Sequence, residues 1–288
     1  MTAAAGAVHA VASVAELVSR VREGRYGADP AEQRISVAFL TSQAVRHGGR
    51  ASGYRNEVLS LRLAEAVGSC AVEPGALPGD ALDGCVGADI GQLLAHPLPA
   101  VRTAALDAYL SHVLPHTPAH GARPVPLPAG SSLLKSRARA RAVVSLLPPA
   151  PAVRRVLVVG VVNSLLEQLR ERGTDYVPCD LKGGSTEWGE HVRTDTHAEL
   201  DRCDALLVSG MTLGNGTFTP LLEHARATAK PLVLFAQTGS AVLPRFVGSG
   251  VTAVSAEPYP FFWLDGGPGV LHHYSTAGGG AGRPAGTA

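Results

Sequence analysis

The second half of the chain alternates short apolar runs with amphipathic, charged stretches. Parallel strands are buried on both faces and need helical crossovers, so this alternation predicts a parallel sheet flanked by helices. The runs recur about every 20 to 30 residues, which fits a doubly wound, Rossmann-like domain of the α/β class. The expected strands are Arg155–Gly160, Asp175–Leu181, Ala205–Gly210, Leu232–Ala236 and Val251–Ala256, with helices over Val162–Arg172 and Pro220–Ala229.

The first half mixes helical and strand-like periodicity, which indicates a smaller α+β unit. Ser13 is a suitable N-cap for an amphipathic helix over 12–25, and Pro99 is a suitable first-turn residue for a helix over 99–114. The remaining expected elements are a strand at Ile35–Leu40, a segment at Asn56–Ala66 whose spacing leaves strand and helix open, and a short helix at Ile90–Ala95.

A run of prolines separates the two halves. It extends from Pro115 to Pro128 and cannot continue a helix. The run predicts a linker over 116–130, between an α+β domain at 1–115 and the Rossmann-like domain at 131–276. The last residues, 277–288, are rich in Gly, Ala and Pro, and we expect them to be disordered.

The charge content narrows the class of partner. Only 17% of the residues are charged and the formal net charge is +1, so we expect no electrostatically driven binding to nucleic acid. No continuously apolar run reaches the roughly 18 residues that a membrane span needs, and the N-terminus has no basic segment ahead of an apolar one. We therefore expect a cytoplasmic protein, not associated with a membrane, that binds a small molecule.

Residues that commonly ligate metals are scattered along the chain. The four cysteines form no C-x-x-C pair, which predicts neither a zinc site nor a disulfide framework. His112, His116 and His120 recur at helical spacing, but Pro115 and Pro118 interrupt that helix. We therefore expect linker histidines without a role and no preformed, closed metal site.

Small and polar residues follow the predicted strands. In an open parallel sheet the ligand lies beyond the carboxyl ends of the strands, so we expect a site there. Gly214 and Gly216 permit close backbone approach, and Thr217 can cap the next helix, whose free N–H groups would suit an anionic or carbonyl ligand. The candidate ligand-binding residues are Gly160, Asn163, Asp180, Gly210, Thr212, Gly214, Asn215, Gly216, Thr217, Thr238, Gly239 and Ser240.

The dinucleotide fingerprint is incomplete. G-x-G-x-x-G needs three glycines, and the first strand-to-helix turn offers Gly160 alone. Asp180 follows 20 residues later, where an acidic residue can bind a ribose hydroxyl, although Asp at a strand end is more often a turn or capping residue. These features argue against NAD and leave an adenosine-containing ligand open.

The segment Pro258–Trp263 concentrates aromatic residues in a chain that has few of them. A packing cover over the sheet would account for this segment. A flat wall for a planar ligand at the domain interface would account for it equally well.

Several segments of the second half resemble a known family. They are VLVVG at Val156–Gly160, DALLVSGMTLGNGTFTPLLE at Asp204–Glu223 and PLVLFAQTGSAVLPRFVGSGVTAV at Pro231–Val254. This order is similar to the "putative heavy-metal chelation" family, whose Rossmann-like second domain carries an SG-T--N-T turn, here Ser209–Thr217. The resemblance implies a leading domain with an enolase-N-like fold and a ligand site in the cleft between the domains. The family's Gly-Pro-Ser turn is replaced here by Gln237–Ser240, so its ligand contacts are expected to differ.

Two functions are compatible with these features. The first is a binding protein that holds a metal ion, a metal chelate or a planar small molecule between the domains, in metal handling or specialised metabolism. The second is a Rossmann-type enzyme that uses S-adenosylmethionine or another adenosine-containing cofactor in a biosynthetic pathway, with Asp180 contacting the ribose. The missing phosphate fingerprint favours the first. Gly- and Ala-rich helices such as Val101–Leu110 pack closely and would suit a homodimer.

Overall fold

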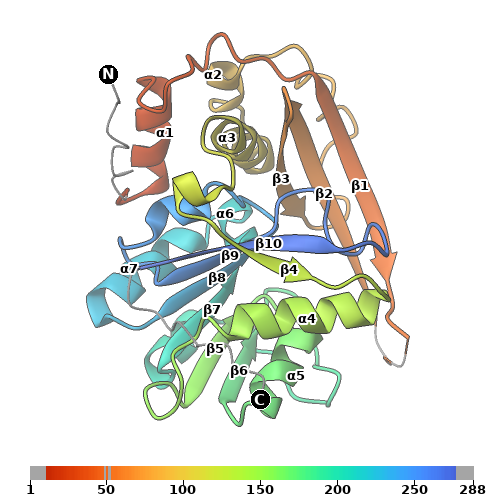
Figure 1. The fold of residues 1–288 in the computed structure, drawn as a ribbon, viewed down its shortest axis with the longest axis vertical. Helices are drawn as coiled ribbons and strands as arrows, with labels where there is room; N and C mark the ends of the chain where they lie inside the picture. Colours follow the sequence, from red (N-terminus) through yellow and green to blue (C-terminus); the bar gives the residue numbers. More distant parts are fainter. Residues whose placement is uncertain (1–10, 49, 51–52, 277–288) are drawn as a thin grey trace, which may run out of the picture.

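The computed structural model describes residues 11–48, 50 and 53–276 (Figure 1). Two sheets organise these residues: a three-stranded sheet in the first part of the chain and a seven-stranded sheet in the second. The segment 277–288, expected to be a disordered tail, lies outside the described residues. No helix in the described part of the chain is long and apolar enough to cross a membrane.

The small unit is an antiparallel sheet packed against helices. Strand β2 is its central strand, and the pairing of β2 with β1 runs from Val37 opposite Arg62 to Val45 opposite Tyr54. The segment whose spacing left strand and helix open is therefore a strand, and it buries residues 58–61. The elements of this unit are α1 Val14–Arg22, β1 Val37–Val45, β2 Tyr54–Leu63, β3 Ala66–Val72, α2 Ile90–Leu93 and α3 Pro99–Val113.

Helix α3 lies directly on β3. A Cβ atom at Gly68 would lie 2.0 Å from Ala108 N and 2.3 Å from Ala104 O, so a glycine is needed for this approach of the two backbones. Helix α3 buries nine of its 15 residues, including the charged Asp107. The small side chains of this helix therefore serve close packing inside the protein.

The large sheet has the strand order β4-β10-β9-β8-β7-β5-β6. Strands β5 to β9 are parallel, and β10 runs antiparallel to both of its neighbours. Because β5 pairs with β6 on one side and β7 on the other, the strand order reverses there, which creates the topological switch point of doubly wound sheets. The elements are η1 Pro118–His120, β4 Arg123–Leu127, α4 Ser132–Val144, β5 Arg155–Val159, α5 Asn163–Glu171, β6 Asp175–Cys179, η2 His197–Arg202, β7 Ala205–Ser209, α6 Met211–Gly214, α7 Phe218–Thr228, β8 Leu232–Ala236, η3 Leu243–Phe246, β9 Ala253–Ala256 and β10 Gly269–Ser275.

The two faces of the large sheet have separate cores. Val156 and Val158 of β5 pack with α4 and α5, whereas Leu157 faces the opposite side. On that side the apolar cluster continues through α7 into the small unit, where it includes Leu59 and Val101. The predicted fold class is confirmed, since a Rossmann-like α/β sheet follows a smaller α+β unit, and the two units share one continuous core.

The proline-rich segment 116–130, expected to be a linker, contributes a strand to the large sheet. Strand β4 pairs with β10 at the edge of the sheet (Figure 1). An edge strand has a neighbour on one side only. It therefore tolerates Pro124 and Pro126, which have no N–H group to donate to a second strand. Strands β3 and β10 and helix α4 are likewise not among the elements that the sequence periodicity predicts.

Candidate functional site

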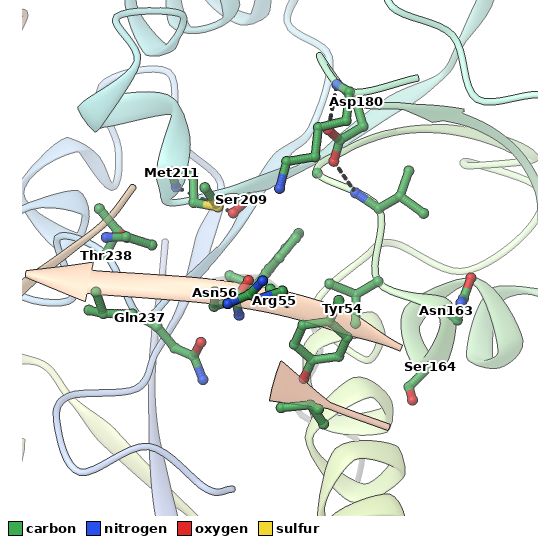
Figure 2. A pocket seen from close by; sticks show the side chains of 18 of the residues that line it. Tyr54, Arg55, Asn56, Asn163, Ser164, Asp180, Ser209, Met211, Gln237 and Thr238 are labelled. Carbon is green, nitrogen blue, oxygen red and sulfur yellow. Dashed lines mark hydrogen bonds between the residues drawn. The ribbon is translucent and has the colours of Figure 1, made fainter. Parts of the chain in front are cut away.

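A cavity of about 550 Å³ lies between the small unit and the carboxyl edge of the large sheet (Figure 2). Strands β1 and β2 and the end of β3 contribute one wall, and the turns after β5, β6, β7 and β8 contribute the opposite wall. Helix α4 and the aromatic residues 261–263 complete the lining. The cavity is therefore at the switch point of the sheet, where doubly wound folds bind their ligands.

The predicted ligand-binding residues divide into two groups. Those that border the cavity are Gly160, Asn163, Asp180, Thr212, Asn215, Thr217 and Thr238. Those that do not border it are Gly210, Gly214, Gly216, Gly239 and Ser240. Both groups lie on the same turns, so the packing of each turn decides which of its residues can meet a ligand.

The turn after β8 docks the small unit onto the large sheet. Thr238 Oγ1 accepts a hydrogen bond from Ala71 N at 2.8 Å, and Gly239 N donates to Ser69 O at 3.1 Å. Ser240 is fully buried, with its hydroxyl 3.4 Å from His116 Nε2. Thr238 and Gly239 therefore hold the two units together in this fold, and Ser240 is buried behind them.

The turn after β7 makes a second contact with the small unit. A Cβ atom at Gly214 would lie 2.7 Å from the Sγ atom of Cys70 in β3. The short helix α6 can therefore pack on β3 because residue 214 is a glycine. This glycine serves the contact between the units and does not reach the cavity.

Thr217 does not cap helix α7 as predicted. It occupies the N-cap position, but its backbone is already helical (φ −88°, ψ −2°) and its side chain makes no capping hydrogen bond. A capping side chain needs extended backbone at this position in order to reach back to the free N–H groups. The Thr217 hydroxyl instead donates to Asn215 Oδ1 at 2.7 Å, in the loop that borders the cavity.

Asp107 connects three elements beneath the cavity. Its carboxylate accepts hydrogen bonds from Ser69 N at 2.9 Å and from Ala241 N at 2.7 Å, so it joins α3 to β3 and to the turn after β8. Burial raises the pKa of Asp107 to about 7, against the opposing effect of these backbone N–H groups. A charged residue this deeply enclosed has a structural role here, since it does not border the cavity.

Asp180 also uses its carboxylate to organise backbone. Oδ2 accepts a hydrogen bond from Val161 N at 3.1 Å and Oδ1 accepts one from Lys182 N at 3.0 Å, as Figure 2 shows. The carboxylate therefore ties the turn after β5 to the turn after β6. Lys182 pairs in turn with Glu73 of the small unit, with Nζ and Oε2 2.7 Å apart.

Arg139 on α4 and Glu257 after β9 form a buried ion pair beside the cavity, which sequence reasoning missed. Arg139 Nε donates to Glu257 Oε2 at 2.6 Å. Glu257 also accepts from Gln237 Nε2 and from Phe262 N, both at 2.8 Å. The two charged residues are 118 positions apart in the sequence, and no local pattern marks either of them.

Two further arginines of the small unit border the cavity and differ in their pairing. Arg50 donates to Glu187 at 2.5 Å and to Glu167 at 2.6 Å, which connects the loop after β1 to the Rossmann-like domain. The side chain of Arg55 has no ion pair or hydrogen bond with any residue that the structure describes. The charge of Arg55 is therefore available to a ligand.

The aromatic segment after β9 lies at the cavity. Phe261, Phe262 and Trp263 all contribute to the lining, and Tyr54 of β2 contributes another ring. The Trp263 indole N–H donates to the side chain of Gln43 in β1, so this segment also contacts the small unit. Of the two alternatives for this segment, a wall of the cavity agrees with its position.

Side chains that could hold a metal ion do not gather at the cavity. No group of three or more His, Cys, Asp or Glu with suitable geometry occurs in the described residues. All four cysteines are buried, and burial raises the pKa of Cys70 to about 12 and that of Cys203 to about 11. The donor set therefore does not fit a metal ion held by protein side chains alone.

His47 and His116 are both engaged by neighbouring side chains. His47 borders the cavity, but its Nδ1 atom lies 2.9 Å from Ser132 Oγ, and burial lowers its pKa. His116, expected to be a linker residue without a role, is half-buried, with Nδ1 2.8 Å from the Tyr274 hydroxyl. Burial lowers the pKa of His116 to about 3, so it is a neutral packing residue.

Residues 143–256 match the sequence model of the family described as "Putative heavy-metal chelation". The match spans β5 to β9 and includes the turns that border the cavity. It confirms the resemblance noted in the sequence. No curated protein matches the chain.

Two solved structures share the architecture. One is a protein of unknown function of the DUF364 family from Desulfitobacterium hafniense DCB-2, with 16% identity and a TM-score of 0.52, covering 83% of this chain and 86% of that one. The other is a DUF364 protein of unknown function from Pyrococcus horikoshii, with 17% identity, a TM-score of 0.52 and the same coverage of both chains. At these identities the likeness shows the fold.

Proposed function

We propose that this chain, whose residues 143–256 match the DUF364 "Putative heavy-metal chelation" family, binds a small molecule or metal complex. The ligand would lie in the cavity between the two units. The ligand we favour is a metal chelate, meaning a metal ion already held by an organic molecule. Such a role would suit metal handling or specialised metabolism.

The chemistry of the cavity lining carries this proposal. A bare transition-metal ion needs several protein donors of the Cys, His, Asp or Glu type, and the described residues offer no such group. A chelate supplies its own donor atoms and needs only a shaped pocket. The cavity volume of about 550 Å³ falls within the roughly 300 to 1,000 Å³ of small-molecule sites.

The polar groups of the cavity suit an organic ligand. Thr212, Asn215 and Gln237 offer hydroxyl and amide groups, and Arg55 offers a positive charge without a protein partner. Aromatic rings lie on the same lining and would contact the flat part of a ligand. Most charged residues of the lining are paired with one another or with neighbouring residues, which leaves neutral polar groups, aromatic rings and Arg55 for a ligand.

The test is a calorimetric titration of the full chain, purified free of metal, with three matched probes. These are Ni²⁺ alone, free citrate and the Ni²⁺–citrate complex, with the Fe³⁺–citrate complex as a second chelate. Native mass spectrometry of untreated protein would reveal a ligand that co-purifies. We expect binding of a chelate or a co-purifying organic molecule, and no saturable binding of Ni²⁺ alone. Tight stoichiometric binding of the bare ion, or no binding of any chelate and no co-purifying ligand, would contradict the proposal.

A second candidate is an enzyme that uses an adenosine-containing cofactor such as S-adenosylmethionine. The position of Asp180 at the switch point favours it, whereas the engagement of both Asp180 oxygens with backbone N–H groups counts against a ribose contact. If this candidate holds, S-adenosylmethionine should raise the melting temperature of the wild type and not that of Asp180→Asn. Thermal stability unchanged by S-adenosylmethionine, S-adenosylhomocysteine and ATP would dismiss it.

A further inference from the structure

Arg139 presents unused hydrogen-bond donors inside the protein. The residue is 6% exposed and borders the cavity. Its Nε atom donates to Glu257, and neither Nη atom has a hydrogen bond with any residue that the structure describes. A guanidinium has five N–H donors, so the four on the Nη atoms lack protein acceptors.

These donors face open space. Some side-chain nitrogen and oxygen atoms of the described residues are fully enclosed and have no hydrogen-bond partner. Arg139 Nη1 and Nη2 are not among these enclosed atoms. Both atoms are therefore reached by solvent, although the residue as a whole is buried. Arg139 borders the cavity, and we infer that its Nη atoms face this open space.

The guanidinium is also held in a fixed orientation. The Phe235 and Phe262 rings lie 5.7 Å and 5.8 Å from its central carbon. Glu257 holds the Nε side, and Glu257 itself is fixed by hydrogen bonds from Gln237 and Phe262. The edge formed by Nη1 and Nη2 is therefore preorganised, and little entropy would be lost when an acceptor binds there.

The charges around this edge favour an anion. Asp180 and Glu73 are the acidic residues of the lining, and they are engaged with backbone N–H groups and with Lys182, respectively. Arg55 adds a positive charge without a partner among the described residues. Glu257 balances the charge of Arg139, so the charge of Arg55 is the one that an anionic ligand of this cavity would neutralise.

We propose that the ligand of this cavity carries a carboxylate, which the Nη1–Nη2 edge of Arg139 binds through two parallel hydrogen bonds. The flat guanidinium edge matches the planar arrangement of the two carboxylate oxygens. The aromatic rings of Tyr54 and Trp263 line the same cavity and would contact an apolar or planar part of the ligand. This inference rests on the proposed function, because it names the anchoring group of a ligand in the same site.

The test uses benzoate and benzamide, which have the same ring and differ in charge and in acceptor geometry. Isothermal titration of the wild-type chain should show benzoate binding at least about tenfold tighter than benzamide, since charge-assisted hydrogen bonds are stronger than neutral ones. Equal affinities, or no benzoate binding at millimolar concentration, would overturn the inference. Inorganic phosphate is titrated in parallel, and phosphate binding tighter than benzoate would also overturn the carboxylate assignment.

Variants on the same helix then assign the effect to Arg139. Arg139→Gln should lose benzoate affinity by about tenfold or more, and Arg139→Lys should lose part of it because the charge stays and the two-pronged edge is gone. Arg141→Gln is the matched control, because Arg141 is exposed on α4 and does not border the cavity. Unchanged benzoate affinity in Arg139→Gln would overturn the inference.

Removing Arg139 leaves Glu257 buried without its partner, so the single variant could fail to fold. The double variant Arg139→Gln, Glu257→Gln removes both charges and should lose benzoate binding while remaining folded. Chelate binding that survives in the Arg139 variants would contradict the carboxylate anchor and leave the proposed function standing. Benzoate binding through Arg139 without binding of any chelate would contradict the proposed function and leave the anchor standing.

Discussion

The carboxylate of Asp107, on helix α3, accepts a hydrogen bond from the backbone N–H of Ala241, 2.7 Å away in the turn after β8. The contact joins residues 134 positions apart and couples the small unit to the edge of the parallel sheet that borders the cavity. The two units therefore form one packed body around the cavity.

Replacing Asp107 should weaken this coupling. In Asp107→Asn one of the two oxygens becomes an NH₂ donor that faces a backbone N–H, which leaves a buried donor without an acceptor. We expect the free energy of unfolding to fall by about 1 to 3 kcal/mol in urea titrations. Asp83→Asn, an exposed exchange of the same kind, should have little effect. Equal stability of the two variants would contradict the structural role of Asp107.

Two threonines that both border the cavity should respond differently to the same exchange. Thr238→Val removes the acceptor of the Ala71 N–H, so we expect a loss of about 1 to 2 kcal/mol in urea unfolding. Thr217→Val removes only a bond to Asn215 in an exposed loop, and its effect should stay within about 0.5 kcal/mol. The opposite order would mean that the turn after β8 does not dock the small unit.

Gly68 should tolerate no side chain. The Cβ atom of Gly68→Ala would overlap backbone atoms of α3, which cannot move aside as a flexible side chain can. We expect a loss of about 3 kcal/mol, the upper end of the usual range for overpacking, or failure to fold, as measured by circular dichroism during thermal unfolding. Gly84→Ala is the control, because a Cβ atom there would meet nothing within 4 Å. A folded Gly68→Ala protein of wild-type stability would contradict the close contact between α3 and β3.

Acid should destabilise the protein partly through His116. In the unfolded chain this residue binds a proton below about pH 6.5, whereas in the folded protein burial lowers its pKa to about 3. The stability contributed by the neutral ring is present above pH 6.5 and is lost as the pH falls towards 3. Between pH 7 and pH 5 the wild type should therefore lose about 2 kcal/mol more than His116→Gln in urea unfolding.

The control for this measurement is His112→Gln on α3, because the His112 side chain has no hydrogen bond with any residue that the structure describes. Its pH profile should follow that of the wild type. Parallel profiles for the wild type and His116→Gln would show that His116 does not titrate differently in the two states.

The cysteines should be unreactive in the folded protein. All four are buried, and burial raises the pKa values of Cys70 and Cys203 to about 12 and about 11, so the reactive thiolate is scarce at pH 8. Ellman's reagent should detect no thiol in the native chain within minutes and four thiols in guanidinium chloride. Rapid labelling of native protein would reopen a role for thiolates in metal binding.

Much of the fold could be predicted because burial leaves a local trace in the sequence. Strand β8 at Leu232–Ala236 coincides with its expected bounds, and β5, β6 and β7 differ from theirs only at the carboxyl ends. Helix α4 left a weaker trace, because it buries Lys135 and Arg139 as well as apolar residues. Strand β4 was hidden by its two prolines, which only an edge position permits.

The sequence by itself determined the class of the fold and the sheet edge at which a ligand would bind. Both follow from periodicity and from the rule that parallel strands present their carboxyl ends together. Only the tertiary structure decided which residues of that edge border the cavity, because Gly214 and Gly239 contact the small unit and Ser240 is buried. Only the tertiary structure brought Arg139 and Glu257 together, since a contact across 118 residues depends on the packing of α4 over the sheet and leaves no mark on neighbouring positions.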